Sequence, residues 1–291
     1  SACGVIETAA KSKKINKVLC GQNGILGALN ENLIDTSKES KSTIAKLKNT
    51  PGGAFGSCRF KLQDPIAQKK EYDRLFEVFA AHHIGYFFYN GGGDSQDTTY
   101  KISEMAKKLK FPIQCIGIPK TVDNDLPFTD CSPGFGSVAK YVATSTLEAG
   151  LDVKSMAETS TKVFILEVMG RHAGWIALHA GLAGGADVIL IPEISWDFDA
   201  ICQKIMNRES VGRRHTLIVV AEGATLPTGD LVCMAPTEVN EQVKLGGIGQ
   251  IVAGEIAKRL DRQTRTVVLG HLQRGGSPTT FDRVLATEFG V

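Results

Sequence analysis

The sequence predicts an α/β fold with mainly parallel sheets that helices cover on both faces. Short apolar runs alternate with segments of helical periodicity along almost the whole chain, as in successive β-α units. The polar residues that stand out follow these runs, at the edge where open α/β sheets bind ligands: Asp94, Asp123, Arg171, Glu222, His271 and Arg274. We expect them to form the rim of one site.

The composition is that of an ordinary globular enzyme and argues against several other classes. The 291 residues allow one large or two medium domains, and 43% of them are hydrophobic and 22% charged. A net charge of +2 does not favour nucleic acid as a partner, and no apolar run approaches the length of a membrane span. No signal peptide is visible, and the seven cysteines are scattered without a Cys-x-x-Cys pair. We therefore expect reduced thiols and a cytoplasmic protein.

The elements of the first part of the chain follow from these periods. We expect a helix over 1–10, a glycine-interrupted apolar stretch over 18–27, a polar loop and helix over 35–48, a helix over 72–83, a strand over 86–89, a helix through Leu109 and a strand over 113–118. The first helix is already under way at residue 1, which is typical of a fragment.

The second part of the chain continues the same alternation. We expect helices over 135–149, 175–182, 198–208 and 248–260, and strands over 162–168, 188–192, 217–221 and 266–269. A helix-like pattern starts at Phe281 and stops at Val291, so the end of the chain also indicates a fragment.

The loop over 119–127 is the first candidate for chemistry. It follows a buried strand, is bounded by a proline at each end, and carries Asp123 and Asp125 with Lys120 and Thr121 beside them. Paired carboxylates beside a cation at the carboxyl end of a strand suit catalysis, although a polar turn of this kind also occurs by chance.

A glycine-rich loop over 90–95 is the second candidate. It lies between an apolar run and a helix, and glycines there let backbone N–H groups approach an anion at the helix N-terminus. A further glycine-rich turn over 51–59 ends in Arg59 and is either a surface loop or another wall of an anion site. Together, the loops over 90–95 and 119–127 favour phosphoryl transfer.

Four linked motifs make the chain similar to the phosphofructokinases. They are Gly91-Gly92-Gly93-Asp94-Ser95, Pro119-Lys120-Thr121-Val122-Asp123-Asn124-Asp125, Glu167-Val168-Met169-Gly170-Arg171 and the run from Gly270 to Pro278. The chain most resembles the pyrophosphate-dependent branch, because Asp94 fills the fourth place of the glycine-rich loop, where ATP users have glycine. Lys120 before Thr121 points the same way, since a cation there neutralises the departing phosphate.

The resemblance implies two Rossmann-like three-layer α/β/α domains with the active site in the cleft between them. Residues 1–134 with 271–291 would form an incomplete pyrophosphate domain, and residues 135–270 the fructose 6-phosphate domain. It further implies reversible phosphoryl transfer from pyrophosphate to the 1-hydroxyl of fructose 6-phosphate, with Mg²⁺ as cofactor. A homodimer or homotetramer is expected, because family members often have an arginine from a neighbouring subunit where Lys162 stands here.

Residue roles carried over from the family fall into three groups. Asp123 would be the general base, supported by Asp125, and Lys120, Thr121 and Arg171 would complete the catalytic set. The residues expected to bind the sugar phosphate are Thr121, Val122, Asp123, Lys162, Met169, Gly170, Arg171, Glu222, Arg265, His271 and Arg274. Those expected to bind the donor are Arg59, Gly92, Gly93, Asp94, Ser95 and Lys120.

The chain departs from the family pattern in two respects. Gly93 stands where an aspartate usually organises Mg²⁺, so the metal would be held through Asp94, or through Asp123, with the substrate phosphates. Family members also begin with a strand and glycine loop that this chain lacks, so we expect the fragment to be unstable or inactive.

Other functions stay open. Asp94 and Lys120 disfavour an ATP-dependent phosphofructokinase. The presence of Asp123, Arg171 and Arg274 disfavours a non-catalytic regulatory subunit. A generic nucleotide-binding module would have no use for the sugar-phosphate residues. Two of the candidate residues could instead have a purely structural role: Glu222 could form a salt bridge at the end of a strand, and His271 could be an ordinary loop histidine.

Overall fold

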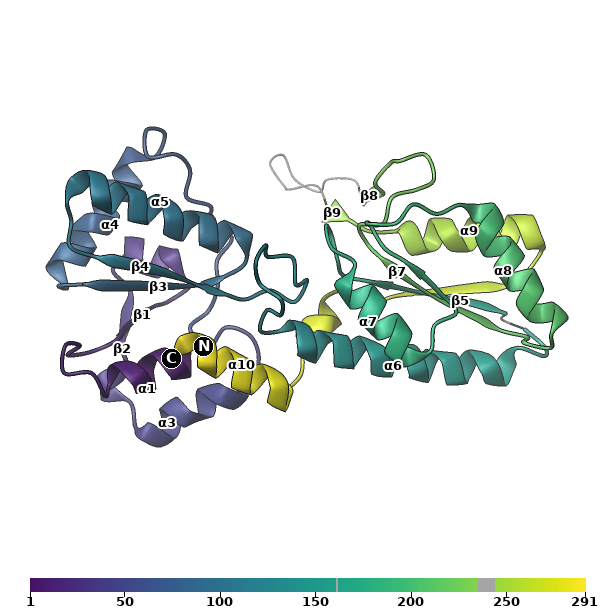
Figure 1. The fold of residues 1–291 in the computed structure, drawn as a ribbon, viewed down its shortest axis with the longest axis horizontal. Coiled ribbons are helices and arrows are strands. Elements are labelled where there is room, and N and C mark those ends of the chain that lie inside the picture. The colour runs from purple at the N-terminus through teal and green to yellow at the C-terminus, as the bar shows by residue number, and fades with distance from the viewer. Residues whose placement is uncertain (161, 235–243) are drawn as a thin grey trace. The chain divides into compact units, whose positions relative to one another are not determined.

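The computed structural model describes residues 1–160, 162–234 and 244–291, and these fall into two compact units (Figure 1). Unit 1 comprises residues 1–121, 126–134 and 276–291, and unit 2 comprises residues 122–125 and 135–275. These bounds differ from the expected ones in two places. Residues 122–125 of the carboxylate loop belong to unit 2, and so do residues 271–275, because the 3₁₀ helix η3 (Gly270–Arg274) contacts strand β5 (Val163–Val168).

Unit 2 is built on a four-stranded, fully parallel sheet. The strand order is β10 (Thr264–Val268), β5, β7 (Thr216–Ala221) and β6 (Val188–Leu190). β7 is buried at every position and β5 at all but one. Strands that are buried on both faces require helices on both faces, which confirms the predicted α/β architecture.

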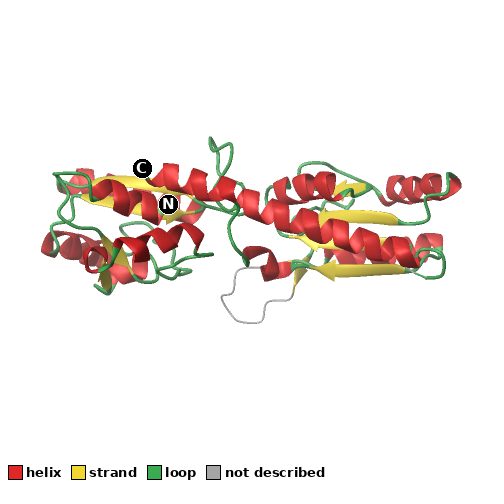
Figure 2. Ribbon diagram, turned by 90° about the horizontal axis from the view of Figure 1, so that it is seen from below, coloured by secondary structure: helices red, strands yellow, loops and turns green. Residues whose placement is uncertain are grey.

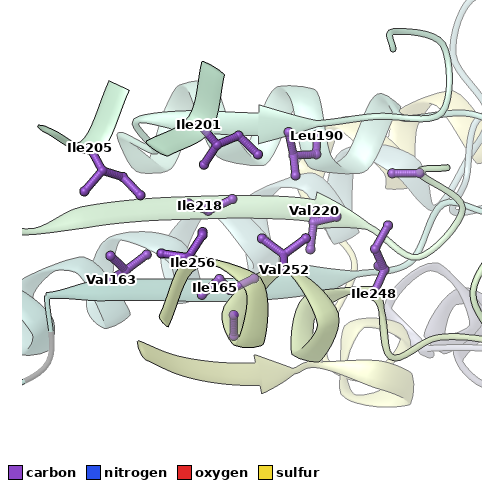
Figure 3. Packing of buried hydrophobic residues seen from close by; sticks show 12 residues of the cluster. Val163, Ile165, Leu190, Ile201, Ile205, Ile218, Val220, Ile248, Val252 and Ile256 are labelled. Atoms are coloured by element: carbon purple, nitrogen blue, oxygen red, sulfur yellow. The ribbon is translucent and has the colours of Figure 1, made fainter. Parts of the chain in front are cut away.

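Two pairs of helices cover this sheet. Helices α8 (Phe198–Ser210) and α9 (Ile248–Leu260) bury Ile201, Ile205, Val252 and Ile256 against one face (Figure 3). Each such buried side chain contributes about 1.5–3 kcal/mol. The other face carries α6 (Phe135–Met156) and α7 (Trp175–Gly184), which lie in front of the strands in Figure 2. α6 extends beyond the expected end at Ala149, where Gly150 lies beside the Leu217 side chain and Val153 is fully buried.

Unit 1 has a smaller parallel pair, β3 (Tyr86–Gly91) and β4 (Gln114–Pro119). Helices α4 (Lys69–Ala81) and α5 (Gly93–Leu109) pack in one core with α2 (Ile25–Leu29). The largest buried side chains of this core include Tyr72, Leu75 and Ile102, together with Leu62 from the preceding loop.

The remaining elements of unit 1 surround its termini. β1 (Leu19–Gly21) and β2 (Leu33–Asp35) form an antiparallel pair, followed by η1 (Thr36–Lys38), α3 (Lys41–Lys46) and η2 (Leu47–Asn49). α1 (Ala2–Ala9) packs against α10 (Thr280–Gly290), as Figure 1 shows. A Cβ at Gly4 would lie 2.2 Å from the carbonyl oxygen of Thr287, so only glycine allows this close approach.

The predicted helices and strands were found in order, with ends that differ by a few residues. The short pair β8 (Cys233–Met234) and β9 (Lys244–Leu245) had no counterpart in the prediction. Within the described ranges, no helix combines the length and the apolar character needed to cross a bilayer.

Candidate active site

Six of the residues expected to bind the sugar phosphate come from one edge of the unit 2 sheet. Met169 to Arg171 follow β5, Glu222 follows β7, and η3 with His271 and Arg274 follows β10. Because these strands are parallel and in register, their carboxyl ends lie at the same edge. The geometry therefore brings together side chains that are far apart in sequence.

Two glycines shape the loop that carries Arg171. Gly170 has φ +131°, a conformation that side-chain-bearing residues rarely adopt. The backbone N–H of Gly223 donates to the carbonyl oxygen of Gly170 at 3.1 Å, and that of Glu222 donates to Val168 at 2.8 Å. A Cβ at Gly223 would lie 1.9 Å from the Arg171 carbonyl oxygen. The Arg171 loop thus lies directly on the end of β7, beside Glu222.

Gln273 connects the Arg171 loop to η3, and the sequence analysis assigned it no role. Its side chain is 2% exposed. The amide oxygen accepts from the backbone N–H of Met169 at 3.2 Å, and the amide nitrogen donates to the carbonyl oxygen of Gly270 at 2.9 Å. The motif contained Gln273, but nothing in its local sequence shows that it would be buried.

Glu167, in the same motif as Arg171, has a structural role. Its carboxylate is 1% exposed and accepts backbone N–H groups at the start of α9, from Gly247 at 2.9 Å and from Gly249 at 2.8 Å. A carboxylate at a helix N-terminus satisfies free N–H donors and complements the helix dipole. Glu167 therefore positions α9 rather than a substrate.

Asp123 lies in a local field of charges from unit 2. The carboxyl group is partly buried, and burial raises its pKa above the ordinary value. Repulsion from Asp125 raises the pKa further, whereas Arg274 and Arg171 oppose the shift. The buried Asn124 between the two aspartates has φ +54°, a left-handed conformation that asparagine tolerates better than most residues. Asp123 is thus a more basic carboxylate than an exposed one, which suits proton abstraction.

Glu222 belongs to the same group of charges. Burial raises its pKa first, and the carboxylate of Asp123 raises it next, while Arg171 lowers it. The two carboxylates and the arginine therefore interact electrostatically.

The other predicted sugar-phosphate residues fall into two sets. His271 and Arg274 are exposed on η3, at the carboxyl edge of the sheet. Arg265 is near the beginning of β10, paired with Phe164, and Lys162 directly precedes β5. The structure therefore places Arg265 and Lys162 at the opposite edge, away from Arg171.

The glycine-rich loop of unit 1 joins β3 to α5. Gly92 is the N-cap of this helix of 17 residues, whose first N–H groups point out of the helix end. A Cβ at Gly91 would lie 2.1 Å from the Ser95 hydroxyl, whereas a Cβ at Gly93 would meet open space. The backbone N–H of Lys120 donates to the carbonyl oxygen of Gly91 at 3.1 Å, so the Lys120–Thr121 segment lies beside the loop.

Asp94, in the first turn of α5, forms an ion pair that the sequence analysis missed. Its Oδ1 lies 2.8 Å from the Nζ of Lys61, and the two side chains are 61% and 50% exposed. The turn predicted to contribute Arg59 therefore brings a second cation, two residues further on, to the glycine-rich loop; Arg59 itself is exposed. No periodicity could have revealed this pair, because the partners are distant in sequence.

The expected Mg²⁺ was tested against these residues. In residues 1–160, 162–234 and 244–291, no group of three or more His, Cys, Asp and Glu side chains could form a metal cage. Mg²⁺ is commonly bound through one or two carboxylates with substrate phosphates and water. The exposed carboxylate of Asp94 in the glycine-rich loop fits that mode.

Comparisons with known proteins give one family. The family model described as "Phosphofructokinase" matches residues 1–291 of this chain. A pyrophosphate–fructose 6-phosphate 1-phosphotransferase of Halomonas elongata is 50% identical over 98% of this chain and 71% of its own length. An ATP-dependent 6-phosphofructokinase of Chloroflexus aurantiacus is 39% identical over 93% of this chain and 71% of its own.

A solved structure agrees with the sequence relatives. The pyrophosphate-dependent phosphofructokinase of Marinobacter aquaeolei superposes with a TM-score of 0.82 at 51% identity, covering 99% of this chain and 69% of that one. The chain thus spans about seven tenths of the length of these relatives. It belongs to the phosphofructokinase family.

Proposed function

We propose that the protein transfers a phosphoryl group reversibly between pyrophosphate and the 1-hydroxyl of fructose 6-phosphate, giving fructose 1,6-bisphosphate and orthophosphate. The observation that carries the proposal is the environment of Asp123, a carboxylate of raised pKa within the field of Arg171 and Arg274. A base next to cations that hold a phosphate is what deprotonation of a sugar phosphate hydroxyl requires.

In the acceptor half, Asp123 takes the proton of the 1-hydroxyl while Asp125 keeps the pKa of Asp123 raised. Arg171, His271 and Arg274 hold the 6-phosphate. The remaining acceptor residues are Thr121, Val122, Met169, Gly170 and Glu222, the last hydrogen-bonding sugar hydroxyls. Orientation by several such contacts lowers the entropic cost of bringing the hydroxyl into line with the donor.

In the donor half, the backbone N–H groups at the start of α5 cradle pyrophosphate beside Gly92, Gly93 and Ser95. Lys120 and Arg59 supply positive charge, and Asp94 crowds the place of a nucleotide α-phosphate. Asp94, together with the donor phosphates, would hold Mg²⁺, which would supply positive charge to the phosphate oxygens. Asp94 thus disfavours ATP as a donor.

Two features extend the proposal to the assembly and the compartment. Lys162 and Arg265 lie at the edge of the unit 2 sheet away from Arg171. They therefore suit phosphate binding in the site of a neighbouring subunit of a homodimer or homotetramer. All seven cysteines are free thiols, which suits the reducing cytoplasm.

The test is formation of fructose 1,6-bisphosphate from fructose 6-phosphate with Mg²⁺, comparing pyrophosphate with ATP. We expect turnover with pyrophosphate and at least tenfold less with ATP. Preference for ATP would support the ATP-dependent alternative. Binding of fructose 6-phosphate without turnover on either donor would support a regulatory subunit.

A further inference from the structure

Lys61 occupies a defined place beside the donor loop because the two residues that follow it are hydrogen-bonded to side chains of α4 and α5. The side chain of Leu62 is fully buried in the unit 1 core. The Nζ of Lys101 donates to the carbonyl oxygen of Leu62 at 3.1 Å. The hydroxyl of Tyr72 donates to the carbonyl oxygen of Gln63 at 2.9 Å. The backbone at Lys61 is therefore tied to the helix whose N-terminus faces the donor.

From this place the Lys61 ammonium reaches Asp94. Nζ lies 2.8 Å from Oδ1, within hydrogen-bond distance. The lysine ammonium thus holds one carboxylate oxygen of Asp94.

The ion pair resolves an electrostatic conflict at the start of α5. A helix N-terminus carries the equivalent of about +0.5 charge, and that charge is what attracts a phosphate. The full negative charge of Asp94, in the first turn of the helix, would outweigh it and repel a polyanion. The charge of Lys61 offsets that of Asp94, so the helix end again attracts anions. The carboxylate itself stays in place.

We propose that Lys61 is a positioning residue of the donor site: it holds Asp94 beside the glycine-rich loop and cancels its repulsion, so that inorganic pyrophosphate binds there. The inference rests on the proposed function, in which pyrophosphate is the phosphoryl donor. It requires that pyrophosphate affinity depend on Lys61 only while Asp94 carries its charge. A lysine that served only to stabilise the fold would show no such dependence on Asp94.

A double-mutant cycle tests this coupling. The dissociation constant of inorganic pyrophosphate would be measured by calorimetry without Mg²⁺, so that no metal offsets the charge of Asp94, for the wild-type protein, Lys61→Met, Asp94→Asn and the double variant. We expect Lys61→Met to weaken binding about tenfold in the wild-type background and less than threefold in the Asp94→Asn background, where the charge to be offset is gone. Lys61→Arg, which keeps the charge, should bind within about threefold of the wild type.

The matched control is Lys107→Met. Lys107 forms an ion pair with Glu104 at 2.6 Å near the other end of α5, so its loss should leave pyrophosphate binding unchanged. The KM for fructose 6-phosphate should stay within twofold in every variant, and thermal melting would confirm that each one folds.

Two results would overturn the inference. One is that Lys61→Met binds pyrophosphate as tightly as the wild-type protein does. The other is an equal loss in both backgrounds, which would make Lys61 a direct ligand independent of Asp94. If the wild-type protein neither binds nor turns over pyrophosphate, the proposed function itself fails, which is a different outcome from either of these.

Discussion

The candidate donor loop of unit 1 and the candidate acceptor loops of unit 2 are built in different ways. In unit 2, the acceptor loops are held by buried polar side chains, with Gln273 2% exposed, and the pKa values of Asp123 and Glu222 are raised chiefly by burial. In unit 1, the donor loop carries an ion pair whose two side chains are at least half exposed, and Gly93 borders open space.

The difference teaches which property each half uses. Buried groups interact in a low dielectric and are fixed before substrate binds, so the acceptor half can tune a base and orient a hydroxyl. Exposed charges interact weakly, are screened by salt and can be replaced by other side chains at little cost in stability. We infer that the choice of donor depends on exposed charged side chains, while the chemistry of the acceptor depends on buried groups.

The largest effect is expected in the acceptor half, from Asp123→Asn. The amide cannot take the proton of the 1-hydroxyl, so kcat should fall about 10²–10⁴-fold. Equilibrium binding of fructose 6-phosphate should change little, because the arginines stay in place. A kcat within threefold of the wild type would show that Asp123 is not the base and would remove the main contrast between the two halves.

Gln273→Ala tests whether burial positions the acceptor loops. It leaves the buried N–H of Met169 without its acceptor, at a cost of about 1–3 kcal/mol. We expect the KM for fructose 6-phosphate to rise tenfold or more while the KM for pyrophosphate stays the same.

The control is Gln203→Ala, which removes an exposed glutamine that bonds Asn207 on α8 and should have no effect. If Gln273→Ala raises both KM values equally, the glutamine stabilises the protein generally instead of positioning the Arg171 loop.

Exchange of surface charge should alter the donor. Asp94→Gly combined with Lys120→Gly removes the side chain that crowds a nucleotide and the cation that suits pyrophosphate. The ratio of kcat/KM for ATP to that for pyrophosphate should rise about tenfold, with the KM for fructose 6-phosphate within twofold. An unchanged ratio would mean that donor choice is made elsewhere in the protein.

The smallest effect is a shift in pH dependence from Asp125→Asn. Asp123 acts as a carboxylate, and its raised pKa means that activity is lost at a higher pH, as pH falls, than for an ordinary aspartate. Removing the charge of Asp125 lowers that pKa, so the acidic limb of the pH–rate profile should move to lower pH by less than about one unit.

Glu148→Gln, an exposed change on α6, is the control and should leave the profile in place. Movement of the limb to higher pH in Asp125→Asn would contradict the assigned cause of the shift.

The sequence by itself determined the order of helices and strands, the parallel sheet and the loops that follow its strands. These features depend on local periodicity: an apolar run such as Val163–Val168 must be buried wherever it lies, and glycines at a helix N-terminus allow the same close approach in any context. The motifs of the candidate site could therefore be found without a structure.

Only the tertiary structure decided which residues meet. The Lys61–Asp94 pair, the bonds of Gln273 to the Arg171 loop and the capping of α9 by Glu167 join residues distant in sequence. Likewise, the position of Arg265 along β10 depended on strand register, which placed it at the edge away from His271. Such contacts are set by how helices and strands pack, and the periodicity of a single segment carries no information about its partner.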